Sequence, residues 1–318
     1  MALKQRVRDI ASRHDVNNIY AQKIYRIAIQ KDSFEEVENL IKDKPKPFIK
    51  WVGGKRQLLK QFRLLNLYPP EDFNPDEHAY FEPFVGGGAV FFDLLPEKAE
   101  LSDLNAELVT TYNVIKNDVE ALIKSLSQHK YEKEYYLNVR SWDPQSLSDI
   151  EVASRFIYLN RTGFNGMYRV NSKGKFNVPF GRYSNPSICD EENLRRVSDA
   201  LQGVVINCQD YKKVLDKARK SDFIYFDPPY YPLNRTSSFT SYTAESFLED
   251  EQTELRNAFL ELHKRGCFVM LSNSDTNFIN DLYSNMEGVK VNRVQAGRSI
   301  NSKGSKRGKI SEVLVTNY

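Results

Sequence analysis

From Pro47 onward, short apolar runs alternate with stretches of helical periodicity, and no other feature limits the possible folds of this chain as strongly. Strand-length apolar runs separated by amphipathic helices are typical of a parallel sheet with helical crossover connections. The sequence therefore predicts an α/β fold from residue 47 onward. Strands are expected at 80–84, 100–102, 204–208, 223–226, 268–271, 289–291 and 312–315.

Two segments depart from this alternation. Between 116 and 188 helical patterns dominate, up to a hairpin-like stretch that turns at Lys173-Gly174. Before Pro47, apolar residues recur at helical spacing and Ser33 with Glu36 forms a capping box, which predicts a helical extension. The expected division is an N-terminal helical extension at 1–46, an α/β domain at 47–115 and 189–318, and an inserted, mostly helical domain with a β-hairpin at 116–188.

Composition excludes several classes of protein. The apolar fraction of 41% is enough to form a core, and a net charge of +3 does not by itself indicate a polyanion partner. No apolar run approaches the roughly 20 residues that a membrane span needs, and no signal peptide is recognisable, so we expect a cytoplasmic protein without membrane contact. The cysteines and histidines lack paired or metal-ligand spacing. We therefore expect neither disulfides nor a bound metal.

A carboxylate and two prolines follow the apolar run 223–226, in the sequence Asp227-Pro228-Pro229-Tyr230. Open α/β sheets bind ligands at the carboxyl ends of their strands. The Asp227 carboxylate and the Pro228 carbonyl suit the two hydrogens of an aromatic amino group, and the Tyr230 ring suits stacking on an extruded base. Taken alone, the motif also fits a strand-ending turn with a buried tyrosine.

A glycine-rich stretch, Glu82-Pro83-Phe84-Val85-Gly86-Gly87-Gly88, lies at the end of the first predicted strand. Its spacing is not that of the dinucleotide fingerprint, so it favours a nucleoside such as S-adenosylmethionine, with Phe84 and Gly86 beside it. At the end of the next strand, Asp103 is expected to bind ribose hydroxyls. Each feature also fits an ordinary loop, and their placement at consecutive strand ends favours the nucleoside.

Two further segments add candidates for cofactor binding. In the stretch 48–56, Lys55 precedes Arg56 rather than serine or threonine, which excludes an NTPase phosphate loop. Trp51 is instead expected to form a pocket wall and Lys55 to bind the carboxylate of the cofactor. Asp210 and Tyr211 follow another strand and suit the adenine of the cofactor, although a helix-capping role for Asp210 fits equally well.

In this order, the stretches 48–56 and 82–88 and the motif Asp227-Pro228-Pro229-Tyr230 resemble the Dam family of DNA adenine-N6 methyltransferases. The residues 159–169 and 176–183 resemble the recognition hairpin of that family and its flanks. The resemblance runs from Pro47 to Tyr318 and departs from the family pattern at Val52 and Gly87. It does not cover the helical extension.

The resemblance implies a Rossmann-like S-adenosylmethionine-dependent methyltransferase sheet with a DNA-recognition insert. It implies methyl transfer to an adenine rotated out of double-stranded DNA, with GATC as the favoured target. The implied catalytic residues are Asp227, Pro228 and Tyr230. The implied cofactor residues are Trp51, Lys55, Phe84, Gly86, Asp103, Asp210, Tyr211 and Asp227.

The resemblance also implies roles in the hairpin region. Arg169 would read a guanine edge, Met167 and Pro179 would make apolar base contacts, and Asn165 would fill the space that the adenine leaves. Arg182 and Tyr183 would make backbone or flanking contacts. A solvated basic turn is the plain alternative for this segment.

Other functions stay open at this point. Methylation of an RNA adenine or a protein amide would use a similar four-residue motif, and a catalytically silent DNA-binding regulator would keep the same fold. The hairpin argues against the first reading and the intact catalytic motif against the second. We expect a monomer, and a partner restriction endonuclease is compatible with the sequence. Tyr242 is expected on a loop that closes over the site, and 301–309 is expected to form a basic loop.

Overall fold

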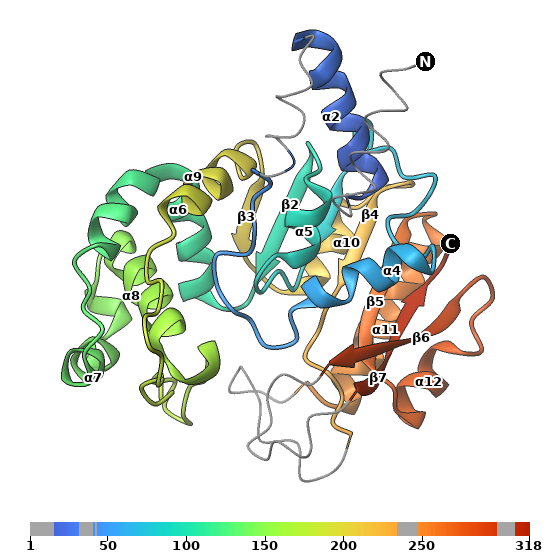
Figure 1. Cartoon of the computed structure of the whole chain (residues 1–318). Coiled ribbons are helices and arrows are strands. Elements are labelled where there is room, and N and C mark those ends of the chain that lie inside the picture. The colour runs from blue at the N-terminus through green and yellow to red at the C-terminus, as the bar shows by residue number, and fades with distance from the viewer. Residues whose placement is uncertain (1–15, 32–40, 42, 234–246, 298–308) are drawn as a thin grey trace.

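The computed structural model describes residues 16–31, 41, 43–233, 247–297 and 309–318. Within them the chain forms a seven-stranded sheet of order β3-β2-β1-β4-β5-β7-β6 (Figure 1). The first five of these strands are parallel, whereas β7 is antiparallel to both of its neighbours. The strands are β1 Tyr80–Glu82, β2 Ala99–Asp103, β3 Val205–Cys208, β4 Phe223–Phe226, β5 Phe268–Ser274, β6 Lys290–Gly297 and β7 Lys309–Thr316.

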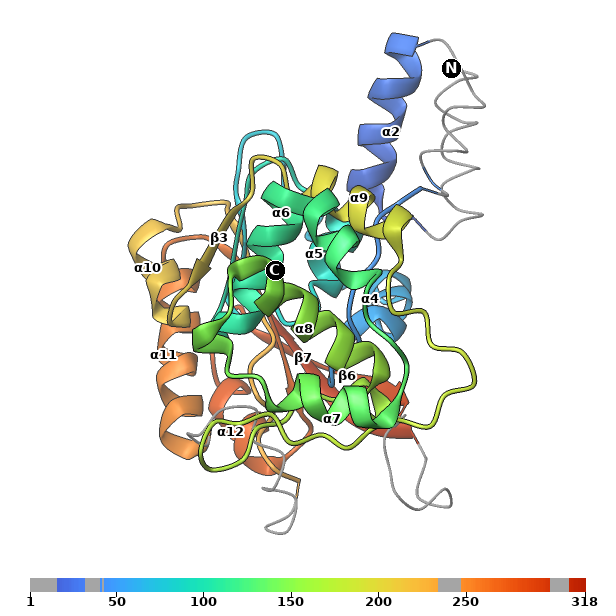
Figure 2. The same ribbon diagram turned by 90° about the vertical axis from the view of Figure 1, so that its left-hand side faces the viewer.

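The centre of the sheet is buried on both faces, which explains why β4 reads as a continuous apolar run. In β4, Phe223 and Tyr225 belong to one hydrophobic cluster, whereas Ile224 and Phe226 belong to another on the opposite face. Helices cover both faces (Figure 2). On the first face lie α4 Leu59–Leu64, α5 Ala89–Leu94, α6 Ala106–Leu126 and α9 Glu191–Ala200, and on the second α10 Val214–Lys217, α11 Glu249–Lys264 and α12 Asn277–Tyr283.

The predicted α/β fold is confirmed, and each of the seven predicted strands has a counterpart in the sheet. The strand order resembles the doubly wound dinucleotide fold with one antiparallel strand, β7, added between β5 and β6. Strand β6 is longer than the predicted 289–291, because it pairs with β7 from Lys290 to Gly297. Cross-strand pairing, rather than apolar residues, extends it.

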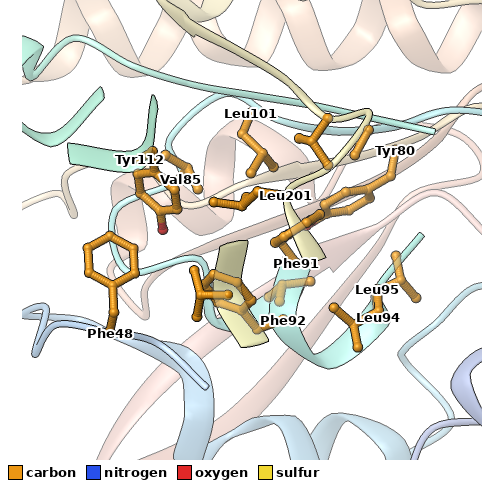
Figure 3. Packing of buried hydrophobic residues seen from close by; sticks show 14 of the residues in the cluster. Phe48, Tyr80, Val85, Phe91, Phe92, Leu94, Leu95, Leu101, Tyr112 and Leu201 are labelled. Atoms are coloured by element: carbon orange, nitrogen blue, oxygen red, sulfur yellow. The ribbon is translucent and has the colours of Figure 1, made fainter. Parts of the chain in front are cut away.

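The larger cluster joins the sheet to the segment before the first strand. Phe91, Phe92, Leu101 and Tyr112 gather with Phe48 (Figure 3). The rings of Phe48 and Tyr112 meet edge to face, with 4.9 Å between their centroids. Burying such rings stabilises the fold, and here it also anchors the start of the stretch 48–56 against α5 and α6.

A helical group stands beside the sheet (Figure 1). It is formed by α6, α7 Lys133–Ser141 and α8 Asp149–Thr162. Helix α6 runs through the expected domain boundary at 116 and has non-helical dihedral angles at Asp118. Helix α8 begins with a capping box in which Ser148 and Glu151 hydrogen-bond each other's backbone amides.

An ion pair ties α8 to the first turn of α6. The guanidinium of Arg155, buried in the helical group, lies 2.8 Å from a carboxylate oxygen of Glu107. The other oxygen of Glu107 accepts a hydrogen bond of 3.2 Å from the hydroxyl of Tyr168. The carboxylate of Glu107 therefore joins the sheet domain, helix α8 and the segment that leads into the hairpin.

The described part of the N-terminal extension packs against the sheet domain. Helix α2, Asn18–Lys31, buries Ile24 in the larger cluster. The carboxylate of Asp93, in α5, accepts hydrogen bonds from Asn17 at 3.2 Å and from Lys44 at 3.1 Å. Asp93 thus holds the extension on both sides of the helix.

Some expectations fall on residues outside the described ranges: the capping box at Ser33 and Glu36, the loop with Tyr242, and 301–308 of the basic loop. None of the helices in the described part of the chain combines the length and apolarity that crossing a bilayer requires.

Candidate active site at the carboxyl ends of the strands

The motif Asp227-Pro228-Pro229-Tyr230 directly follows the last residue of β4 and lies at the carboxyl ends of the parallel strands. The ammonium group of Lys55 lies 2.7 Å and 2.8 Å from the two carboxylate oxygens of Asp227. The same group donates to the carbonyl of Gly53. Lys55 was expected to bind a carboxylate of the cofactor, and in this structure its ammonium group binds that of Asp227.

Burial and the ion pair act on Asp227 in opposite directions. Desolvation raises the pKa of the Asp227 carboxyl to about 6, because the charged form loses water, and the ammonium group of Lys55 limits that rise. Lys55 itself is 2% exposed. Asp227 is therefore largely ionised at neutral pH, so both of its carboxylate oxygens act only as hydrogen-bond acceptors.

Tyr230 is held at its ring and at its hydroxyl. The ammonium nitrogen of Lys55 lies 4.8 Å from the centroid of the ring, within the range of a cation–π contact. The phenol donates a 2.8 Å hydrogen bond to a carboxylate oxygen of Glu312, on β7. Burial, the largest cause, and the nearby carboxylates raise the pKa of Tyr230, so the phenol stays protonated. Glu312 was not among the predicted site residues.

Glu82 in the glycine-rich stretch has a structural role. Its side chain is buried, and one carboxyl oxygen accepts hydrogen bonds from the hydroxyl of Tyr80 at 2.8 Å and from the amide of Phe91 at 3.1 Å. Burial raises the pKa of Glu82 to about 8. A largely neutral carboxyl thus links the end of β1 to the first turn of α5.

The glycines allow a close approach between two segments. A Cβ atom on Gly86 would lie 2.6 Å from the ring of Trp51, and Gly86 has a φ of +46°. The amide of Gly86 donates to the carboxylate of Asp103 at 3.1 Å, which links the ends of β1 and β2. Trp51, Gly86 and Asp103 therefore lie together at the carboxyl ends of β1 and β2.

A second group of predicted residues lies at the ends of β1 and β3. The rings of Phe84 and Tyr211 stack with 5.3 Å between centroids and 26° between planes. The carboxylate of Asp210 accepts a hydrogen bond of 2.8 Å from the amide of Lys212, so Asp210 does cap the short helix that follows. Asp210 also lines an open cavity of about 420 Å³.

These residues fit a nucleoside. The half-buried ring of Phe84, supported by the buried ring of Tyr211, suits an adenine ring, and the carboxylate of Asp103 suits ribose hydroxyls. The carboxylate of Asp103 already accepts hydrogen bonds from the amides of Gly86 and Asn105, at 3.1 Å and 3.0 Å. A carboxylate has about four acceptor positions, so positions are left for a ligand.

The predicted DNA-contacting residues lie on one short two-stranded segment. Antiparallel bridges join Gly163 to Phe180 and Val170 to Phe176, and the turn between the latter pair contains Gly174 with a φ of +72°. Of the predicted DNA-contacting residues, Asn165, Arg169 and Pro179 are exposed and Met167 is half-buried within this segment, and just beyond it Arg182 is exposed and Tyr183 is half-buried.

The guanidinium of Arg169 is oriented by Asn177. Its guanidinium donates to the side-chain carbonyl of Asn177 at 2.7 Å and to the backbone carbonyl of Asn177 at 3.3 Å. Tyr183 lies under the ammonium group of Lys50, 4.9 Å from the ring centroid. Its hydroxyl donates to the carbonyl of Gly163, which fixes the ring against the base of the hairpin.

Sequence reasoning missed the residues that join these groups. Asn160, on α8, binds the backbone of Lys50, and Tyr168 stacks on Trp51 with 5.8 Å between the ring centroids. Glu312 binds Tyr230. Asn160 and Glu312 could have been noticed in the sequence as polar residues within a mostly apolar helix or strand. Their partners, however, become visible only once distant segments pack together.

Comparison with known proteins shows the family of this chain. Residues 51–300 match the family model of D12 class N6 adenine-specific DNA methyltransferases. The chain is 46% identical over 281 residues to the Type II methyltransferase M1.LlaDCHI of Lactococcus lactis, which covers 86% of this chain and 95% of that protein.

Two further relatives have the same extent. The Type II methyltransferase M.MjaIII of Methanocaldococcus jannaschii is 47% identical over 291 residues, covering 86% of this chain and 99% of that protein. The DNA adenine methylase of Vibrio cholerae is 36% identical over 277 residues, covering 86% and 96%. The Dam-type resemblance is thereby confirmed: the chain belongs to the D12 class of N6 adenine-specific DNA methyltransferases and is an adenine-specific DNA methyltransferase.

Proposed function

We propose that this enzyme transfers a methyl group from S-adenosylmethionine to the N6 atom of an adenine rotated out of duplex DNA, within the sequence GATC. The observation that carries the proposal is the group formed by Asp227, Lys55 and Tyr230 at the end of β4. It combines an ionised acceptor, a cation that keeps the acceptor ionised, and an aromatic face.

The chemistry at the amino group is mainly positioning. S-adenosylmethionine, when bound, supplies a methyl group on a positively charged sulfur. The Asp227 carboxylate and the Pro228 carbonyl accept the two amino hydrogens, and Tyr230 stacks on the base. The amino nitrogen would take this methyl group, and the electron pair of the carbon–sulfur bond would stay on the sulfur. The nitrogen then loses one proton, which the carboxylate of Asp227 or water accepts.

This chemistry requires Asp227 to exchange partners. Both of its oxygens bind Lys55 here, so one of them turns to the amino group when adenine enters. A lysine ammonium is well suited to such an exchange, since its three donors sit on a flexible stem. Lys55 is then able to keep one contact with Asp227 and direct another donor to the cofactor.

The cofactor is proposed to lie along the strand ends. Asp103 would bind the ribose, Phe84, Asp210 and Tyr211 the adenine, and Trp51 with Gly86 the methionine portion. The close packing of Trp51 on Gly86 supports this assignment, because it places the Trp51 ring next to the residue whose amide binds Asp103.

DNA is proposed to bind across the hairpin of the insert, which we assign to 116–188, between the two parts of the catalytic domain at 47–115 and 189–318. Arg169 would read a guanine, Met167 and Pro179 would contact bases, and Asn165 would occupy the space of the adenine. Arg182 and Tyr183 would contact the backbone or flanking bases. The enzyme would act as a monomer, with or without a partner endonuclease.

The test is incubation of the enzyme with labelled S-adenosylmethionine and duplexes that contain or lack GATC. Label at N6 of the GATC adenine is expected, and Asp227→Ala should abolish it while DNA binding persists. Label in RNA or protein but not in duplex DNA would contradict the proposal, as would binding of DNA with no transfer by the wild type. Sequencing of methylated DNA from a strain that expresses only this enzyme decides the recognition sequence.

A further inference from the structure

The backbone of the catalytic motif is held by two buried amide side chains. Proline has no N–H group, so the segment from Pro228 to Pro229 offers no donors with which to fix itself. Instead, the carbonyl of Pro229 accepts a 3.0 Å hydrogen bond from Gln252, and the amide of Tyr231 donates a 3.1 Å hydrogen bond to Asn273.

These two side chains also bind each other. The amide nitrogen of Asn273, on β5, donates to the side-chain carbonyl of Gln252, on α11, at 2.9 Å. Both residues are fully buried, at 0% exposure. Ser274 adds a hydrogen bond of 2.7 Å from its hydroxyl to the carbonyl of Tyr231. Breaking any one of these hydrogen bonds would leave a buried polar group unpaired, which is costly. The complete network is therefore rigid.

The positions of these contacts determine what they fix. The carbonyl of Pro229 belongs to the peptide group before Tyr230, and the amide of Tyr231 belongs to the peptide group after it. The Gln252–Asn273 pair thus holds both peptide groups that flank Tyr230, and these set its φ and ψ angles. Glu312 holds the other end of the same residue, at the phenol.

We propose that Gln252 and Asn273 are positioning residues for methyl transfer: they set the backbone of Tyr230 so that its ring faces the target adenine. The inference rests on the proposed function. Neither residue touches the reacting atoms, so they act through the geometry of the loop. A displacement on the order of 1 Å at a reacting centre lowers rates by about 100-fold.

The experiment replaces each amide by an apolar group of similar size, in Gln252→Met and Asn273→Leu. The matched control is Asn317→Leu, because the side chain of Asn317 also binds the backbone at β5. It accepts a 2.7 Å hydrogen bond from the backbone amide of Val269 and donates one of 2.8 Å to the backbone carbonyl of Cys267. Asn317 lies at the opposite end of that strand from the catalytic loop. Circular dichroism first establishes a temperature at which all variants are folded.

Single-turnover methylation of duplex DNA should slow by roughly 10- to 100-fold in Gln252→Met and Asn273→Leu. The dissociation constants for DNA and for S-adenosylmethionine should stay within about threefold, since neither residue contacts either ligand. Asn317→Leu should keep the wild-type rate constant even where it lowers the melting temperature. A rate within about twofold of wild type in Gln252→Met, or a loss explained by weaker binding, would overturn the proposal.

Hydrogen exchange separates this inference from the proposed function. The amide of Tyr231 should exchange slowly in the wild type and faster in Gln252→Met and Asn273→Leu, whether or not the protein methylates DNA. A wild type that transfers no methyl group would contradict the proposed function. Unchanged exchange at the amide of Tyr231 in both variants would instead contradict the inference that Gln252 and Asn273 hold the backbone around Tyr230.

Discussion

The side chain of Asn160 binds both backbone groups of Lys50: it accepts from the amide at 2.9 Å and donates to the carbonyl at 2.8 Å. The same amide nitrogen donates to the carbonyl of Gly166 at 2.9 Å. One residue of α8, 3% exposed, therefore joins the stretch 48–56 to the turn that precedes the hairpin.

Asn160→Ala should destabilise the protein by about 2–3 kcal/mol, because it leaves buried backbone groups of Lys50 and Gly166 without a partner. Urea unfolding measures the change. Asn138→Ala, at an exposed position on α7, is the control and should stay within about 0.5 kcal/mol of the wild type. Equal stability of the two variants would show that the bridge contributes nothing.

The pKa of Asp227 predicts an acid limb in the activity profile. The proposed role needs the ionised carboxylate, and its pKa is about 6, so single-turnover activity should fall as the pH drops through 6. Lys55 lowers this pKa, so Lys55→Met should move the limb to higher pH. A limb that stays in place in Lys55→Met would mean that Asp227 is not the titrating group.

The hydrogen bond between Tyr230 and Glu312 should couple the two residues in catalysis. Tyr230→Phe keeps the ring and loses the hydroxyl, so it should cost less than Tyr230→Ala, which also removes stacking worth roughly 1–3 kcal/mol. In a double-mutant cycle, Tyr230→Phe and Glu312→Gln should show a coupling energy of about 1 kcal/mol in the transfer rate. Additive effects would show that the contact does not orient the ring during transfer.

Glu82 should make stability depend on pH. Its folded-state pKa of about 8 lies above the ordinary value of 4.5, so its contribution is complete below pH 4.5 and is lost as the pH rises through 8. Glu82→Gln keeps a neutral acceptor for Tyr80 and Phe91 and should flatten this decline. Thermal unfolding at a series of pH values between 5 and 9 measures it, and an unchanged slope would exclude Glu82 as the source.

Arg169 should contribute to reading one base pair. If it binds a guanine edge, Arg169→Ala should cost on the order of 1–3 kcal/mol of discrimination at one position of the target. Asn177→Ala keeps the guanidinium and removes the side-chain contact that orients it, so its loss should be smaller. Methylation of duplexes with single base-pair changes measures both, and an unaltered preference in Arg169→Ala would refute the role.

Much of the site was predictable because it depends on local order along the chain. Short apolar runs marked the central strands, and the carboxyl ends of parallel strands meet on one side of the sheet, so Asp103, Gly86 and Asp227 were expected near one another. Asp210 shows the limit: its sequence context fits a helix cap and a cofactor ligand alike, and the structure shows the cap.

By itself, then, the sequence determined the α/β fold, the positions of the strands and the motifs at their ends, because apolar periodicity and turn residues act over a few positions. Tertiary structure decided the pairings between distant residues: Lys55 with Asp227, Tyr230 with Glu312, and Gln252 with Asn273. These polar residues leave no periodic trace. Their partners depend on how strands and helices pack, and for the fully buried Gln252 and Asn273 the pairing is enforced because an unpaired polar group in the core is costly.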